Sequence, residues 1–183
     1  MFKGAITAIV TPFKEDESLD LDALKSLVEF QIKNKIDGIV PCGTTGESPT
    51  LDYEEHEKVI ETVIEAANGK VQVIAGTGSN STKEAIDMTR RAADAGADAS
   101  LQVSPYYNKP TQEGLFRHFS AIAKAVDIPI IIYNIKGRTA VNVETQTLAR
   151  LQKEHSNIVA VKEASGDINQ MQDVLNTLPK SFD

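Results

Sequence analysis

Short apolar runs alternate regularly with segments of helical periodicity along this chain, and this alternation limits the folds that the chain can adopt. Six apolar runs rich in β-branched residues lie at 4–10, 37–41, 71–75, 98–103, 128–134 and 157–162. Helical spacing of apolar residues predicts helices at 22–35, 54–67, 82–95, 112–126, 144–155 and 168–178. Short strands that are apolar on both faces, each followed by a helix, indicate a parallel sheet covered by helices.

The repeat length of about 30 residues suits either a TIM barrel or a doubly wound sheet. Polar clusters follow almost every predicted strand, which favours the barrel, because there all the loops after the strands build one site. We therefore predict an α/β fold of the TIM (β/α)8 barrel type, as a single domain over 1–183. A closed barrel needs eight units and the chain holds six. We expect the isolated chain to open into a flatter sheet, to associate through its edges, or to be a portion of a longer protein.

Local signals support the predicted helices. Three sequences have the form of a capping box at a helix start: Asp52-x-x-Glu55, Ser81-x-x-Glu84 and Asp167-x-x-Gln170. Gly69 and Gly96 stand where helices are expected to end.

Composition narrows the class of function. The net charge of −7 argues against nucleic acid or an anionic membrane as a partner, since both attract basic patches. No apolar run approaches the roughly 20 residues of a membrane span, and no signal peptide is recognisable. The single cysteine, Cys42, excludes an intrachain disulfide and a cysteine-based zinc cluster. We expect a cytoplasmic protein, with a catalytic Cys42 as an unsupported alternative.

Two glycine-containing loops follow the second and third predicted strands. "CGTTGESPT" (42–50) lacks the phosphate-loop pattern, but its amides and two hydroxyls could hold a small carboxylate; a simple turn into a helix explains it equally well. "GTGSNST" (76–82) has two glycines without the third of a dinucleotide-binding loop, so it is a weak signal for a dinucleotide.

The loops after the fourth and fifth strands carry tyrosines and an arginine. At least one of Tyr106 and Tyr107 is expected to face a site or an interface, although a surface pair covering the loop is the alternative. Tyr133 ends the fifth strand, where barrel catalysis takes place. Arg138 offers a guanidinium suited to a carboxylate, or is a solvated loop residue.

Lys162 comes directly out of the buried sixth strand. Desolvation among apolar walls would lower the pKa of its amine. A neutral amine is the nucleophile that forms a Schiff base with a ketone, and Tyr133 on the neighbouring strand could carry the protons. The alternative is a lysine that extends from the strand end into solvent.

Together these motifs resemble the pyruvate-dependent aldolases of the dihydrodipicolinate synthase and N-acetylneuraminate lyase superfamily. The resemblance runs along the whole chain through "GAITAIVTPF", "GTTGE", "AGTGSNST", "PYYNKPTQEG", "YNIKGRT" and "VKEASGD". "GTTGESPT", "PYYN" and the arginine of "GRT" are similar to the dihydrodipicolinate synthase branch rather than the sialic-acid branch.

The resemblance implies a reaction in lysine and diaminopimelate biosynthesis. Pyruvate would condense with Lys162, and the enamine would attack aspartate 4-semialdehyde to give 4-hydroxy-tetrahydrodipicolinate. Tyr133 would donate and accept protons in a relay with Thr44 and Tyr107, the last crossing to a neighbouring subunit. Thr45 would bind the pyruvate carboxylate. No metal or organic cofactor is implied.

The resemblance also implies two further features. Arg138 would hold the semialdehyde carboxylate and order the relay. The family binds lysine as a feedback inhibitor at a subunit interface of a homo-oligomer, which is a tetramer in full-length members. The matching positions here are Ser48, His56, Asn80, Glu84 and Tyr106. Tyr53 stands where sensitive members often carry histidine.

Two residues depart from the family pattern. Lys136 replaces a usual proline, so the loop near Arg138 loses a stiffener. Gln102 replaces a usual apolar residue, and a buried amide there needs partners. Two other functions remain open: a pyruvate lyase acting on sialic acid or a 2-keto-3-deoxy sugar acid, and an inactive fragment or assembly module. We expect turnover by this chain alone to be absent or very low.

Overall fold

The sheet consists of six parallel strands in chain order. The structure is a computed structural model and describes residues 2–183. The strands are β1 (Ile6–Ala8), β2 (Gly38–Val40), β3 (Gln72–Gly76), β4 (Ala99–Val103), β5 (Ile130–Asn134) and β6 (Ile158–Glu163). Each is hydrogen-bonded to the next in the chain. A doubly wound sheet reverses its strand order at a switch point, and this sheet does not, so the barrel prediction is confirmed as a curved half-barrel.

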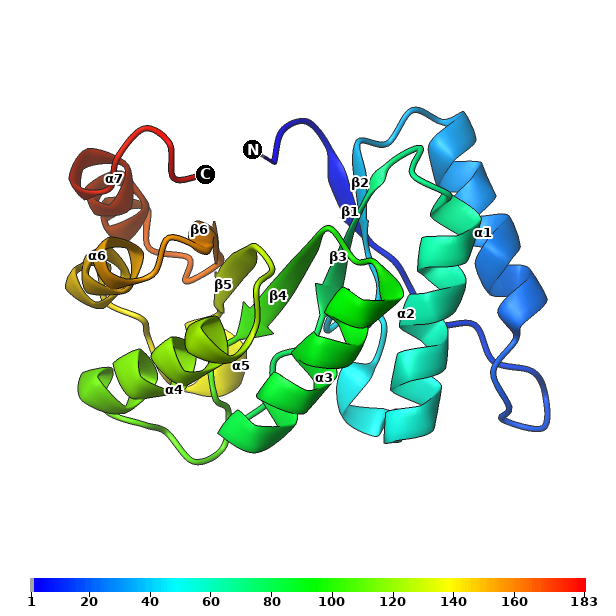
Figure 1. The fold of residues 1–183 in the computed structure, drawn as a ribbon, viewed down its shortest axis with the longest axis horizontal. Coiled ribbons are helices and arrows are strands. Elements are labelled where there is room, and N and C mark those ends of the chain that lie inside the picture. The colour runs from blue at the N-terminus through cyan, green and yellow to red at the C-terminus, as the bar shows by residue number, and fades with distance from the viewer. Residues whose placement is uncertain (1) are drawn as a thin grey trace.

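Helices cover the outside of this curve (Figure 1). They are α1 (Leu21–Lys33), α2 (Tyr53–Ala67), α3 (Thr82–Ala95), α4 (Gln112–Ala125), α6 (Thr145–Glu154) and α7 (Ile168–Thr177). Their positions match the predicted helices to within one or two residues at each end. Two short elements were not predicted, η1 (Ser48–Thr50) and α5 (Lys136–Thr139). Lys136 is the first residue of α5, a position for which proline is preorganised, so the substitution keeps the helix and loses only the rigidity.

The helix starts follow the predicted capping boxes only in part. Asp52 and Glu55 form the complete box, each carboxylate accepting from the other residue's backbone N–H. Ser81 accepts from the Glu84 N–H, but the Glu84 carboxylate accepts the hydroxyl of Ser79 at 2.8 Å. The second half of that predicted box is therefore wrong, because a nearer donor competes for the carboxylate.

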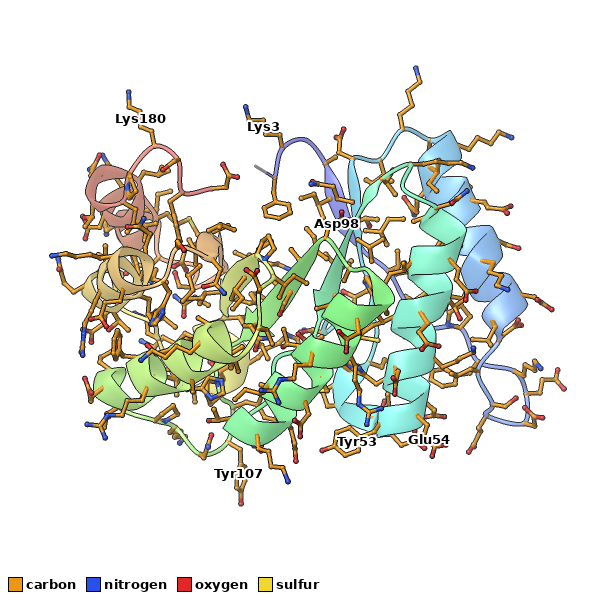
Figure 2. The ribbon with its side chains drawn as sticks, viewed as in Figure 1. Lys3, Tyr53, Glu54, Asp98, Tyr107 and Lys180 are labelled. Atoms are coloured by element: carbon orange, nitrogen blue, oxygen red, sulfur yellow. The ribbon has the colours of Figure 1, made fainter. Side chains whose placement is uncertain are left out.

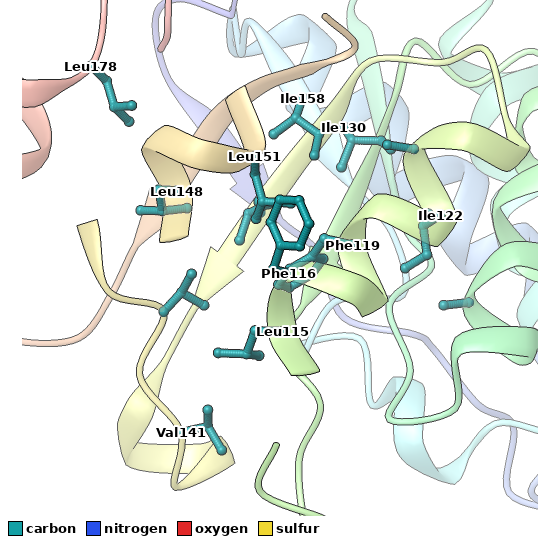
Figure 3. Close-up of a cluster of buried hydrophobic side chains, with 14 of the residues drawn as sticks. Leu115, Phe116, Phe119, Ile122, Ile130, Val141, Leu148, Leu151, Ile158 and Leu178 are labelled. Carbon is teal, nitrogen blue, oxygen red and sulfur yellow. The ribbon is translucent and has the colours of Figure 1, made fainter. Parts of the chain in front are cut away.

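The apolar side chains form layers on both faces of the sheet. Outside β5 and β6, residues of α4 and α6 such as Phe119 and Leu151 pack against Ile130 and Ile158 (Figure 3). A second outer layer lies under α1 and α2. The inner face carries its own cluster: Val40, Ile74, Ala99, Leu101, Ile131, Tyr133 and Ala160. Burial on both faces explains why the strands read as continuous apolar runs.

An irregularity between β5 and β6 decides which side chains face inward. Ile130 pairs with Ile158, but the next residue, Ile131, pairs with Ala160, so the register slips by one residue. Because strand side chains alternate, a slip of one residue exchanges the two faces of the strand beyond it. Beyond the slip, Tyr133 pairs with Lys162.

Gln102 lies in a buried polar cluster between the sheet and α3. Its side-chain nitrogen is within 3.0 Å of the hydroxyls of Thr77, Thr89 and Ser100, and all four residues are fully buried. The hydroxyls also bond one another, and Thr89 donates to the Ala85 carbonyl. The Gln102 Oε1 atom is buried and has no partner among the described residues. The hydrogen-bond partners that a buried amide requires are thus present for the nitrogen of Gln102 but not for its oxygen.

Gln102→Met is expected to raise the free energy of unfolding by about 1 kcal/mol, because an orphaned buried acceptor costs about 1–3 kcal/mol and methionine fills a similar volume. The three hydroxyls keep their bonds to one another and to Ala85. Urea unfolding monitored by circular dichroism measures the change. Gln172→Met, at an exposed position of α7, is the control and should change stability by less than about 0.5 kcal/mol. A loss of stability in Gln102→Met would show that the amide contributes net stabilisation.

His118 makes the fold sensitive to acid. It is 6% exposed between α3 and α4, its Nδ1 lies 2.8 Å from the Thr82 hydroxyl, and burial lowers its pKa to about 4. In the unfolded chain the same imidazole takes up a proton near pH 6.5. Folding with a neutral His118 is therefore not penalised above pH 6.5, and the free energy of unfolding falls as the pH is lowered from 6.5 toward 4. His118→Leu should remove up to about 3 kcal/mol of that acid-dependent loss. Unfolding curves at pH 7 and pH 4.5 test this, and equal losses in parent and variant would contradict it.

Candidate active site

The carboxyl ends of the strands bring Thr44 and Tyr133 to one small cavity. Its volume is about 30 Å³, which is room for about one water molecule. Thr44 comes from the turn after β2, and Tyr133 from the end of β5, where its side chain is 6% exposed. The cavity is lined by Cys42, Gly43, Thr44, Ser48, Gly76, Gly78, Leu101, Val103 and Tyr133. Two residues of the predicted proton relay therefore line the same space.

Lys162 lies beside Tyr133. The two residues are paired across β5 and β6, and the Lys162 Nζ atom is 4.3 Å from the centroid of the Tyr133 ring. Lys162 is exposed as a whole residue, yet partial burial of its side chain lowers the pKa of the amine below its ordinary value. The direction is the one that a nucleophilic amine needs, because it increases the neutral fraction at neutral pH.

The turn after β2 is held by its own backbone. The N–H groups of Gly46, Glu47 and Ser48 bond carbonyls within the turn at 3.1–3.4 Å. Gly46 is packed so closely that a Cβ there would lie 3.1 Å from the Ile9 carbonyl oxygen. Since these three amides are engaged, a small carboxylate at this turn would be held through Thr44 and Thr45, which are both exposed.

The two glycines after β3 have a packing role. A Cβ on Gly76 would lie 2.2 Å from the Cys42 carbonyl oxygen, and one on Gly78 would lie 2.3 Å from the Val103 nitrogen. No larger residue fits where the neighbouring backbones approach this closely. The Gly-x-Gly spacing is thereby explained without a dinucleotide.

Cys42 is not a nucleophile in this structure. Its thiol is buried, lies 3.6 Å from the His56 carbonyl oxygen as donor, and has its pKa raised to about 12 by burial. A thiol with that pKa stays protonated at neutral pH, whereas the reactive form is the thiolate.

Four predicted catalytic or substrate-binding residues do not line the small cavity: Lys162, which lies against the Tyr133 ring, and Tyr107, Arg138 and Thr45. Tyr107 is 90% exposed and projects away from the body of the molecule (Figure 2). Arg138 is exposed on α5, and Thr45 is exposed on the turn next to Thr44. The described chain thus places Tyr133 next to Lys162 and in one cavity with Thr44, and it leaves Tyr107 apart.

A second, larger cavity of about 370 Å³ lies between α2 and α3. It contains two of the residues predicted for lysine binding, His56 and Glu84, together with Tyr53. The Glu84 carboxylate raises the pKa of the Tyr53 hydroxyl. Lys83, Asp87 and Arg91 also line the space, so it has polar groups of both signs.

The remaining residues predicted for lysine binding are divided between two places. Asn80 donates to the Tyr106 carbonyl at 3.2 Å, which ties the loop after β3 to the loop after β4. Ser48 lines the small cavity with Thr44 instead of the α2–α3 cavity. His56 itself is buried, and burial lowers the pKa of its ring.

The sequence reasoning missed a set of amides and one carboxylate behind the site. Asn134 and Glu163 directly follow Tyr133 and Lys162. The Glu163 carboxylate accepts from the side-chain amides of Asn134 and Gln170. A signal for them was present in the sequence, since a polar residue directly follows each of the two candidates Tyr133 and Lys162 at the end of its strand.

Within residues 2–183, no group of three or more His, Cys, Asp and Glu side chains is placed to hold a metal ion. The helices of this part of the chain are all too short or too polar to cross a membrane.

The chain is similar in sequence to proteins of known name. The chain is 60% identical over 183 residues to a 4-hydroxy-tetrahydrodipicolinate synthase of Geotalea uraniireducens (strain Rf4). That match covers the whole chain and 62% of the relative, so the chain spans less than two thirds of the length of the relative.

Two solved structures share the fold. A chloride-inhibited dihydrodipicolinate synthase from Acinetobacter baumannii, in complex with pyruvate, is 49% identical with a TM-score of 0.93; the match covers 96% of this chain and 60% of that one. The enzyme from Cyanidioschyzon merolae with lysine bound is 45% identical with a TM-score of 0.95, and the match covers 97% and 61%.

The match to a protein family extends over the whole sequence. The model of the "Dihydrodipicolinate synthetase family" matches residues 1–183. With the strand order of a barrel and an amine beside a tyrosine at the strand ends, the chain belongs to the dihydrodipicolinate synthetase family.

Proposed function

We propose that this chain carries the Schiff-base chemistry of a 4-hydroxy-tetrahydrodipicolinate synthase, joining pyruvate to aspartate 4-semialdehyde. The observation that carries the proposal is the Lys162 Nζ atom 4.3 Å from the Tyr133 ring centroid, at the carboxyl ends of paired strands. The lowered pKa of Lys162 supports its role as a nucleophile. The name of the Geotalea relative and the pyruvate in the Acinetobacter structure support the choice of substrates.

The proposed reaction begins with attack of the neutral Lys162 amine on the ketone carbon of pyruvate. A C–N bond forms, and the former carbonyl oxygen leaves as water after two proton transfers, which gives the imine. Loss of a methyl proton gives an enamine, whose carbon attacks the aldehyde of aspartate 4-semialdehyde to form the new C–C bond. The amine of that substrate then replaces Lys162 at the imine carbon, which closes the ring and releases the lysine.

Every step needs a proton carrier, including the C–C bond step, in which the aldehyde oxygen becomes an alkoxide and must take up a proton. Tyr133 is the proposed carrier. Thr44 lines the same cavity and would pass protons to and from Tyr133. Tyr107 would complete the relay from a neighbouring copy in a homo-oligomer, a role that suits its exposure. Thr45 would bind the pyruvate carboxylate, and Arg138 the carboxylate of the second substrate.

The competing function is a pyruvate lyase acting on sialic acid or a 2-keto-3-deoxy sugar acid. It would use the same lysine and tyrosine. A coupled assay comparing aspartate 4-semialdehyde with N-acetylneuraminate separates the two. The exposed Arg138, suited to a second carboxylate, favours the semialdehyde.

The α2–α3 cavity is the proposed site of lysine as a regulator. Its Glu84 carboxylate would accept the ligand ammonium, and Tyr53 would contribute a hydroxyl where related enzymes often carry histidine. The bound lysine in the Cyanidioschyzon structure supports this assignment.

Borohydride added with pyruvate is expected to reduce an adduct onto Lys162, because reduction traps an imine as a stable secondary amine. Peptide mass mapping locates the adduct. Lys136, exposed on α5 nearby, serves as an internal control and should stay unlabelled. An adduct on Lys136 alone, or none, would remove Lys162 from the role of Schiff-base lysine.

Glu84→Gln should weaken lysine binding by about tenfold or more, since a hydrogen bond to a charged group contributes about 1.5–3 kcal/mol. Isothermal titration calorimetry measures the affinity. Glu65→Gln removes the same charge from an exposed position of α2 and should leave binding unchanged. Equal affinities of Glu84→Gln and the parent would place lysine elsewhere.

A further inference from the structure

A closed circuit of side-chain hydrogen bonds lies behind the ends of β5 and β6. The Glu163 carboxylate accepts from the Asn134 amide at 3.0 Å and from the Gln170 amide at 2.9 Å. Asn134 also donates to the Asn142 side-chain oxygen at 2.9 Å, and Asn142 donates to Gln170 at 2.6 Å. The circuit thus joins both strand ends to α7 and to the segment after α5.

The orientations of the Asn134 and Gln170 amides are each determined by a bond outside the circuit. The Asn134 side-chain oxygen accepts from the Val143 N–H at 3.0 Å, so its nitrogen must point at Glu163. The Gln170 nitrogen donates to the Val143 carbonyl at 3.2 Å as well as to Glu163. The backbone N–H of Ser165 is a third donor to the carboxylate, at 2.8 Å. Every neighbour in this set is a donor, so only a pure acceptor fits at position 163.

The circuit and the reacting groups occupy opposite faces of the same two strands. Ile131 and Tyr133 belong to the inner face, with their partners Ala160 and Lys162. The next pair, Asn134 and Glu163, points the other way because side chains alternate along a strand. The two strands are also joined through their backbones at this point, since the Ala164 N–H donates to the Asn134 carbonyl at 2.9 Å. A group that holds Glu163 in place therefore also holds the residue before it.

We propose that Glu163, held by Asn134, Asn142 and Gln170, is a positioning residue for Lys162: it fixes the end of β6 so that the amine stays over the Tyr133 ring. The inference rests on the proposed function in that Lys162 is the reacting amine. The circuit lies on the face of the two strands opposite Tyr133 and Lys162. Its effect is geometric, and a displacement of about 1 Å in a reacting group can cost about 10² in rate.

Glu163→Gln is the decisive change. It keeps the size of the side chain but places an NH2 group among donors that have no freedom to turn. The end of β6 should loosen, and Nζ should leave the face of the ring. Glu65→Gln, an identical change on the exposed surface of α2, is the control. The double variant Glu163→Gln with Gln170→Glu returns a carboxylate to the circuit at the same net charge and should restore the geometry in part.

The readout is the NMR spectrum of the chain after reductive methylation of its lysines with 13C-formaldehyde. Methyl groups on Nζ of Lys162 lie over an aromatic ring, so their signal should be displaced upfield from those of the other lysines. A Lys162→Arg variant, which lacks that signal, assigns it. The signal should move to the position of the exposed lysines in Glu163→Gln, stay in Glu65→Gln and return toward its parent position in the double variant.

The rate of borohydride trapping with pyruvate measures the consequence. In unmethylated Glu163→Gln it should fall by about tenfold to a hundredfold. An unmoved Lys162 signal in folded Glu163→Gln would overturn the inference. Should that variant not fold, Gln170→Leu removes one donor to the carboxylate at a half-buried position and carries the same expectations. A displaced parent signal without any pyruvate adduct would instead defeat the proposed function and leave the positioning role standing.

Discussion

The site depends on the register between β5 and β6. A slip of one residue after the Ile130–Ile158 pair sets Lys162 opposite Tyr133 and turns both inward. Without the slip, Val161 would oppose Tyr133, and Lys162 would pair with Asn134 on the helix-covered face. The chemistry proposed here thus requires a bulge, a feature found often beside active sites because it redirects a side chain.

The surrounding packing makes this register stable. Outside the two strands, Ile130 and Ile158 are buried by α4 and α6, so the start of β6 cannot rotate without exposing them. Beyond the slip, Glu163 is held by donors from three segments. Ile158 at the start of β6 and Glu163 at its end both lie on the helix-covered side of the sheet. They are five positions apart, so strict alternation would put them on opposite faces, and the bulge allows both to face the same side.

The two cavities are joined by a short stretch of structure. His56 borders the α2–α3 cavity, and its carbonyl accepts from the Cys42 thiol. Burial lowers the pKa of its ring, and the backbone of Gly76 acts in the opposite direction. Cys42 and Gly76 both line the small cavity with Thr44 and Tyr133. A side chain on Gly76 would meet the Cys42 carbonyl, so the two backbones pack directly against each other at the small cavity.

The class of fold could be predicted from the amino-acid sequence, because strands buried on both faces are continuous apolar runs and each is followed by a segment of helical periodicity. The sequence also identified Lys162 and Tyr133, since reactive groups at the ends of buried strands stand out against apolar neighbours. Their contact depends on the register between β5 and β6, which is seen only in the folded chain. The bulge, the separation of Ser48 from His56 and the partners of Gln102 and Glu163 arise from contacts between residues far apart in the chain. Local periodicity carries no information about such contacts, and one residue of register is enough to exchange the faces of a strand.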